Sequence, residues 1–75
     1  MRFRRKFMNF EYCAEINADD EIYKIGERVF LFLGKYDIVT AKINGYRDGF
    51  LQVYLYNVGV NVEIPTEVIT KIYKI

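Results

Sequence analysis

The sequence predicts a single all-β domain, and three observations lead to this fold class. No segment keeps the sustained apolar period that an amphipathic helix requires. Short runs of β-branched and aromatic residues are instead separated by Gly, Asn and Asp, which favour turns. Of the 75 residues, 52% are hydrophobic and 17% aromatic, which suffices for one small core and exceeds what disordered chains contain.

The N-terminal part of the chain is expected to divide into three segments. Residues 1–6 are rich in Arg and Lys and are interpreted as a basic arm that the fold does not require. Residues 7–16, FMNFEYCAEI, alternate between apolar and polar side chains, which predicts an accessory strand. Residues 17–24 are acidic and connect this strand to a barrel body at 25–75, so that 7–75 form one domain.

Five strands are expected in this body, because five runs rich in β-branched and aromatic residues follow one another there. They cover residues 28–33, 36–43, 50–56, 60–64 and 71–75. Residues 44–49, NGYRDG, hold two turn dipeptides and predict a long loop. Pro65 lacks a backbone donor and is expected to end the fourth strand. A 3₁₀ turn over 66–69 should then place Val68 and Ile69 in the open end of the fold.

The strands of the body are expected to have one aliphatic and one aromatic face, because alternate side chains of a strand point to opposite sides. The aliphatic side is the predicted core, which comprises Val29, Leu31, Leu33, Val39, Ala41, Ile43, Leu51, Val53 and Leu55. The opposite side carries Phe30, Phe32 and Tyr54, and is unusually aromatic for a solvated surface. Two alternatives could cover this aromatic side. Phe10 and Tyr12 of the accessory strand could pack on it, or a second copy of the chain could do so in a homodimer.

Three segments of the body resemble an SH3-like barrel of the Tudor type, with the resemblance extending over residues 25–72. They are Ile25-Gly26-Glu27-Arg28-Val29, Tyr36-Asp37-Ile38-Val39-Thr40-Ala41-Lys42-Ile43 and Val62-Glu63-Ile64-Pro65-Thr66-Glu67-Val68-Ile69. The order and spacing of these segments imply a five-stranded barrel with a 3₁₀ turn before its last strand, to which the N-terminal strand is added. A shared fold does not by itself fix a function.

Tudor-type domains bind methylated lysine or arginine in a cage of aromatic side chains through cation–π contacts. Carried over position by position, the resemblance implies a cage of Phe32, Tyr36 and Tyr54. Asn57 stands where the family has a further aromatic residue, and Phe32 stands where it often has Trp. Both departures weaken the expected cage. The alternative is that Phe32 and Tyr54 pack beneath the accessory strand.

The chain also resembles a second family with this barrel, the plasmid-borne dihydrofolate reductases. That family has a Val-Gln-Ile-Tyr signature in its fourth strand, where this chain has Val-Glu-Ile-Pro at residues 62–65. Those enzymes resemble this chain in size, and assemble as tetramers that bind cofactor and substrate in a central pore. Here a carboxylate replaces the amide and a proline replaces the tyrosine. Because carboxylates lining a pore would repel an anionic cofactor, a small oligomeric enzyme is the third-ranked hypothesis.

The composition argues against several classes of site. One Cys and no His leave no internal disulfide and too few ligands for the usual zinc sites. Without His or Ser the chain lacks a nucleophile–base pair, so no enzyme activity, catalytic residue, metal or cofactor is expected. No apolar run reaches transmembrane length, and the basic start lacks the apolar stretch of a signal peptide. These features predict a cytoplasmic protein with no membrane partner.

The favoured interpretation is a non-enzymatic binding module that acts on a protein partner. Its expected contact residues are Tyr46 and Arg47 at the tip of the 44–49 loop, together with the three cage aromatics. Abundant Ile, Lys, Asn and Tyr are typical of AT-rich genomes, which favours a regulator or inhibitor encoded by a phage or a bacterium.

The alternative function is nucleic-acid binding through the basic arm. The contact residues would be Arg2, Arg4, Arg5, Lys6 and Lys42. A net charge of only +1 argues against strong phosphate-driven affinity. Translation could also begin at Met8, and the chain would then lack the arm but is expected to keep its fold.

Overall fold

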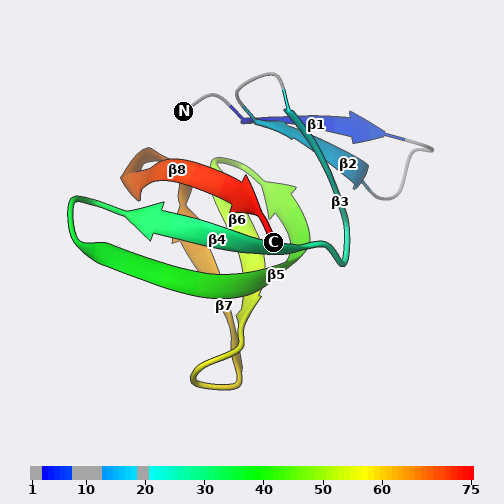
Figure 1. The fold of residues 1–75 in the computed structure, drawn as a ribbon. Helices are drawn as coiled ribbons and strands as arrows, with labels where there is room; N and C mark the ends of the chain where they lie inside the picture. The colour runs from blue at the N-terminus through cyan, green and yellow to red at the C-terminus, as the bar shows by residue number, and fades with distance from the viewer. Residues whose placement is uncertain (1–2, 8–12, 19–20) are drawn as a thin grey trace.

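The computed structural model describes residues 3–7, 13–18 and 21–75, and these residues form an all-β structure, as predicted (Figure 1). The elements are β1 (Phe3–Phe7), β2 (Cys13–Ala18), β3 (Glu21–Lys24), β4 (Arg28–Leu33), β5 (Asp37–Arg47), β6 (Phe50–Leu55), β7 (Val60–Pro65), the 3₁₀ helix η1 (Thr66–Val68) and β8 (Ile69–Lys74). In these ranges the structure contains no helix of the length and apolarity that crossing a membrane requires.

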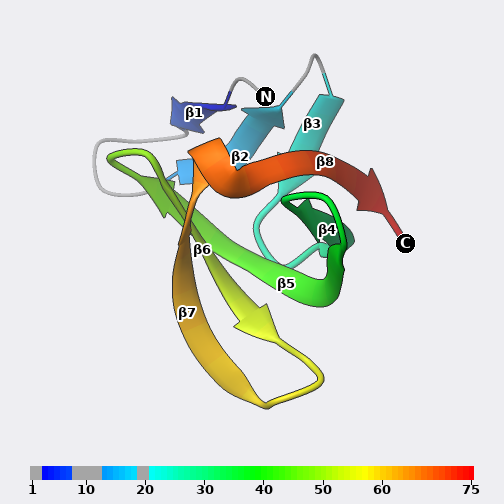
Figure 2. The same cartoon turned by 90° about the vertical axis from the view of Figure 1, so that its left-hand side faces the viewer.

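The strands form two antiparallel sheets. The small sheet has the order β1-β2-β3, and the large sheet has the order β7-β6-β5-β4-β8. The last strand of the large sheet therefore returns to pair with β4, the first strand of that sheet in the sequence. The small sheet lies at one end of the molecule and the β6–β7 turn at the other (Figures 1 and 2).

The prediction of a long loop over residues 44–49 is wrong, because β5 continues through Arg47. The pairing of β5 with β6 shifts register between Ile43 and Gly45, so the first turn signal forms a β-bulge inside the strand. The reversal of the chain is confined to Asp48 and Gly49, whose φ angles are 52° and 83°. Two consecutive residues with positive φ are the usual geometry of a tight hairpin turn.

The backbone of the turn at Gly49 also holds the end of β7 in place, so a substitution there is expected to lower stability. The Gly49 carbonyl accepts hydrogen bonds from the Thr66 backbone N–H at 2.9 Å and from Thr66 Oγ1 at 3.2 Å. Gly49→Ala should lower the free energy of unfolding by about 1–2 kcal/mol, because an L side chain is strained at positive φ. Urea denaturation measures this change. Asp48→Gly should cause no such loss, since glycine adopts positive φ freely, and equal losses in both variants would contradict the explanation.

The core of the large sheet follows the predicted alternation. The fully buried side chains of the predicted aliphatic face are Val29, Leu31, Ala41, Ile43, Leu51 and Val53, while Leu33, Val39 and Leu55 are partly buried against them. Ile69 is also buried, as predicted, but Val68 is 42% exposed and does not fill the end of the fold. The physical reason is that η1 ends at Val68 and β8 begins at Ile69, so these neighbours point to opposite sides.

The N-terminal region differs most from its prediction. Residues 3–7, expected in part as an arm, form β1, and residues 21–24, expected as part of a connector, form β3. Of the strand predicted over 7–16, residues 13–16 belong to β2, which pairs with β1 and β3, and residues 8–12 lie outside the described residues. Phe10 and Tyr12, which we expected to pack on the aromatic face, lie outside the described residues.

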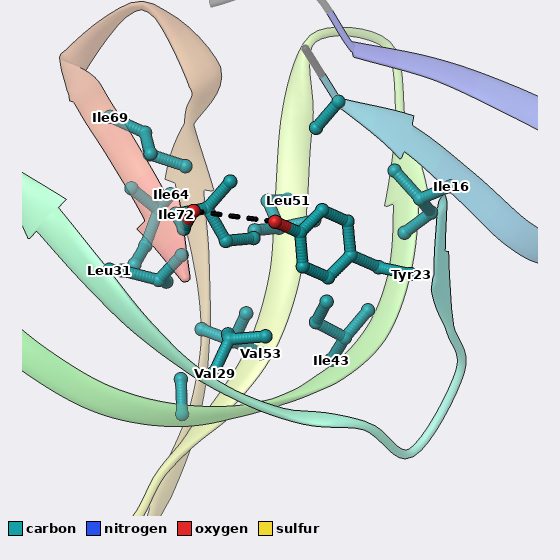
Figure 3. Packing of buried hydrophobic residues seen from close by; sticks show 12 residues of the cluster. Ile16, Tyr23, Val29, Leu31, Ile43, Leu51, Val53, Ile64, Ile69 and Ile72 are labelled. Atoms are coloured by element: carbon teal, nitrogen blue, oxygen red, sulfur yellow. Dashed lines mark hydrogen bonds between the residues drawn. The ribbon is translucent and has the colours of Figure 1, made fainter. Parts of the chain in front are cut away.

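The small sheet contributes side chains to the common core. Ile16 and Ala18 of β2 and Tyr23 of β3 are buried with the aliphatic residues of the large sheet. Figure 3 shows the Tyr23 ring reaching in among these residues, with its hydroxyl directed at β8. That hydroxyl donates a hydrogen bond to the Ile72 carbonyl at 3.3 Å. Ile16, Ala18 and Tyr23 of the small sheet therefore complete the common core.

Ion pairs add a second link between the two sheets. Lys74 Nζ of β8 lies 3.8 Å from Glu21 Oε2 and 3.7 Å from Glu27 Oε2. The same ammonium group lies 5.3 Å from the centroid of the Tyr23 ring. Because these groups are partly solvated, the pairs orient the sheets more than they stabilise them.

Candidate functional site

The three aromatic residues of the predicted cage do not converge in the structure. Phe32 of β4 pairs with Ile38 of β5, whereas Tyr54 of β6 pairs with Lys42. Their partners are four residues apart on β5, which corresponds to about 13 Å at the usual rise of a strand. Tyr36 lies in the turn before β5 and is 90% exposed. No single cation could contact all three rings in this arrangement.

Phe32 and Tyr54 have other aromatic neighbours. The ring of Phe32 meets the ring of Tyr73 of β8 edge to face, with centroids 5.5 Å apart. Tyr54 meets Tyr56 in the same way, also at 5.5 Å. Such edge-to-face pairs contribute packing energy beyond the area they bury. The outer surface of the large sheet therefore carries two separate aromatic pairs in place of one cage.

Tyr46 is also placed differently from its prediction. The bulge at Asn44 shifts the alternation of β5 by one residue, so Tyr46 pairs with the inward-facing Leu51 and is partly buried. Its ring stacks on Phe3 of β1, with centroids 5.8 Å apart and an interplanar angle of 16°. Arg47 is exposed at the end of β5. Tyr46 thus connects the two sheets, and only Arg47 of this pair is free for a partner.

The basic residues of the alternative nucleic-acid site fall in two places. Arg2 lies outside the described residues, and the backbones of Arg4, Arg5 and Lys6 belong to β1, which is paired with β2. Lys42 lies on β5, with its Nζ 5.6 Å from the centroid of the Tyr54 ring. The basic segment is therefore a strand in a sheet over residues 3–7.

The structure instead gathers a set of exposed and partly buried residues on the outer side of β8, β4 and β5. We call this surface the cationic aromatic face, and define it by Arg28, Phe30, Phe32, Ile38, Lys42, Lys71 and Tyr73. Cross-strand pairing brings Phe30 opposite Tyr73, and Phe32 opposite Lys71. Phe30 is 40% exposed, Tyr73 47% and Ile38 56%. Phe30 and Tyr73 thus form an exposed cross-strand pair, and Ile38 is exposed beside Phe32 on the neighbouring strand.

The charges on this face have one sign. Arg28 and Lys42 oppose each other across β4 and β5, and Lys71 lies at the other end of the face. None of the residues that define the face is acidic. Between described residues, the recorded ion pairs involve Lys74, Glu21 and Glu27 but none of these three cations. The face therefore presents positive charges that the described chain does not neutralise.

A second feature is an open hollow of about 420 Å³ on β6 and β7. Its lining residues are Asn44, Gln52, Val53, Asn61, Val62 and Glu63. Asn44 Nδ2 donates a hydrogen bond to Asn61 Oδ1 at 3.0 Å, so two of its polar groups satisfy each other. The hollow could hydrogen-bond a small polar group, but its amides and one carboxylate provide no nucleophile or base pair for catalysis.

Among the residues that the structure describes, no group of three or more His, Cys, Asp and Glu side chains could hold a metal ion. Comparisons with protein-family models, with curated proteins and with solved structures find no match to this chain. A function must therefore be inferred from the geometry and chemistry of its own surface.

Sequence reasoning identified part of the cationic aromatic face and missed the rest. The alternation in β4 correctly placed Phe30 and Phe32 on the outer side. Lys71 and Tyr73 were not assigned to this face, because their position depends on the register of β8 against β4. That register contains an irregularity between Phe32 and Leu33, which no local sequence pattern predicts.

Proposed function

We propose that this chain is a small non-enzymatic binding module that acts on a protein partner through its cationic aromatic face. The proposal includes an SH3-like barrel of the Tudor type as the fold. It is supported by the strand order β7-β6-β5-β4-β8 and by the position of η1 directly before the last strand. In its most concrete form the module is a cytoplasmic regulator or inhibitor encoded by a phage or a bacterium.

One observation carries this proposal, namely the exposed side chains of Phe30, Tyr73 and Ile38 on a face that has cations at both ends. The core of the domain lies on the opposite side of the sheet, so these three side chains are not needed to close it. Aromatic residues and Arg are enriched where proteins bind one another, particularly at the energetic centre of an interface. Exposed large apolar side chains gathered on one face of a small protein indicate a contact surface.

The proposal predicts that a double variant, Phe30→Ala with Tyr73→Ala, stays folded and loses its protein partner. Both side chains are about half exposed, so their removal should disturb the core little. Immobilised wild-type and variant proteins would be used to capture partners from bacterial lysate, with and without nuclease. A matched control, Val58→Ala with Val60→Ala, removes exposed apolar side chains near the β6–β7 turn and should capture as the wild type does.

Three results would contradict the proposal in different ways. Capture at wild-type strength by the Phe30 and Tyr73 variant would exclude the face as the contact surface. Capture that nuclease abolishes would favour the alternative function, nucleic-acid binding. A sizing column that shows a dimer for the wild type and a monomer for the variant would identify the face as a homodimer interface.

Nucleic-acid binding remains the second candidate because Lys42 and Lys71 each lie beside a tyrosine ring, partly buried Tyr54 and exposed Tyr73. Lys42 Nζ is 5.6 Å from the Tyr54 ring centroid and Lys71 Nζ is 5.9 Å from that of Tyr73. Cations interleaved with aromatic rings are typical of surfaces that bind single strands. With three cations on the face, the log–log dependence of affinity on salt should have a slope of roughly −2 to −3.

A further inference from the structure

We propose that the cationic aromatic face binds an extended acidic segment of a partner protein, in which two carboxylates flank an apolar side chain. This inference rests on the proposed function and specifies its partner. The apolar side chain would lie against Phe30 and Tyr73, and the carboxylates would meet Arg28 and Lys42 at one end and Lys71 at the other.

The spacing of the face determines this pattern. Along β4, Arg28, Phe30 and Phe32 lie at successive outward positions, and Lys71 is the cross-strand neighbour of Phe32. The two cationic ends are therefore four residues apart, or about 13 Å, with the aromatic pair midway. An extended segment that runs along the strands presents every second side chain to the sheet. It would match the face with an acidic residue, an apolar residue two positions later and a second acidic residue after two more.

The charges of the face complement a segment of this kind. Lys74, which lies beside the small sheet, already meets Glu21 and Glu27 of its own chain. Lys42 and Lys71 lie beside tyrosine rings instead, and ring contacts leave the ammonium donors available to a carboxylate. Opposite charges between partners chiefly supply orientation and specificity, while the apolar contact supplies affinity.

The observations favour a protein segment over a nucleic acid. The net charge of the chain is only +1, which limits the affinity that phosphate contacts can supply. Phe32 and Tyr73 meet at an interplanar angle of 73° and do not form a parallel platform for successive bases. An apolar side chain, by contrast, needs no parallel platform and can lie against the exposed Phe30 and Tyr73 side chains.

The test uses a fluorescein-labelled peptide that contains two copies of Glu-Thr-Leu-Thr-Glu, titrated with the full chain and followed by fluorescence anisotropy. Replacing Arg28 and Lys71 by Glu should weaken binding on the order of tenfold or more. The matched control carries Lys24→Glu and Lys35→Glu, which change the net charge equally at two exposed positions that lie off the face. Its affinity should stay well above that of the face variant, because exposed charges that lie farther from the peptide than a Debye length are largely screened at physiological salt.

Three results separate failure of this inference from failure of the proposed function. A peptide with Gln in place of Glu that binds equally well, but not to the Phe30 and Tyr73 double variant, would overturn the acidic partner and keep the docking face. Tighter binding of labelled oligo-dT, lost in the Arg28 and Lys71 variant, would overturn both in favour of nucleic acid. If neither peptide binds, the acidic segment is rejected, and lysate capture by the face decides the proposed function independently.

Discussion

Replacing Tyr23 by alanine is expected to lower the free energy of unfolding by about 3–5 kcal/mol, the usual cost of removing a buried aromatic ring. The Tyr23 side chain is 2% exposed and reaches from the small sheet into the core of the large sheet (Figure 3). Its loss would leave a cavity among aliphatic side chains that cannot move together without separating the sheets. A domain of this size has only a few kcal/mol to lose, so most molecules should unfold. Urea denaturation followed by circular dichroism measures the effect.

Two variants test whether the ring or its hydroxyl matters more. Tyr23→Phe removes the buried hydrogen bond to the Ile72 carbonyl and should cost about 1–3 kcal/mol, because this acceptor is left without its donor. Tyr36→Ala removes a ring that is almost fully exposed and should change stability by about 0.5 kcal/mol or less. If Tyr23→Ala were as stable as Tyr36→Ala, the small sheet would not be part of the common core.

The large sheet was predictable because its strands have one buried face. In β4 and β6 the alternation of apolar residues over 28–33 and 50–55 is uninterrupted, and both strands match their predicted bounds within one residue. β5 was predicted too short because its bulge at Asn44 breaks the alternation, and a Gly inside a strand resembles a turn in sequence. Local patterns identify strands well, but they cannot distinguish a bulge from the end of a strand.

The small sheet was mostly missed for a different reason. β1 has the sequence FRRKF and β3 has EIYK, and both are too short and too charged to show a convincing period. Only Tyr23 of β3 is buried, so a single side chain fixes this strand to the core. A contact between residues 49 positions apart, such as Tyr23 with Ile72, leaves no trace in a local pattern. The same limit applies to the Phe30–Tyr73 pair of the cationic aromatic face.

A chain that begins at Met8 is expected to lose stability on the order of 3 kcal/mol, contrary to the sequence-based expectation that it would keep its fold. This chain would lack β1, and β2 would become an unpaired edge of the small sheet. It would also lose the Phe3 ring, which stacks on Tyr46 and packs against the core. Burial of such a ring contributes about 1.5–3 kcal/mol before the strand hydrogen bonds are counted. Thermal unfolding of the full and truncated chains provides the comparison.

Single substitutions separate the loss of Phe3 from the loss of the strand. Phe3→Ala in the full chain should reproduce part of the effect, and Tyr46→Ala combined with it should cost less than the sum of the two, because the rings contact each other. Equal melting temperatures for the full and truncated chains would show that β1 does not contribute to the fold. If truncation does unfold the domain, the loss of nucleic-acid binding by that chain says nothing about Arg4, Arg5 and Lys6 as phosphate contacts. The two functions are then distinguished on the folded full chain, by whether the acidic peptide or oligo-dT binds more tightly and depends on Phe30 and Tyr73 of the face.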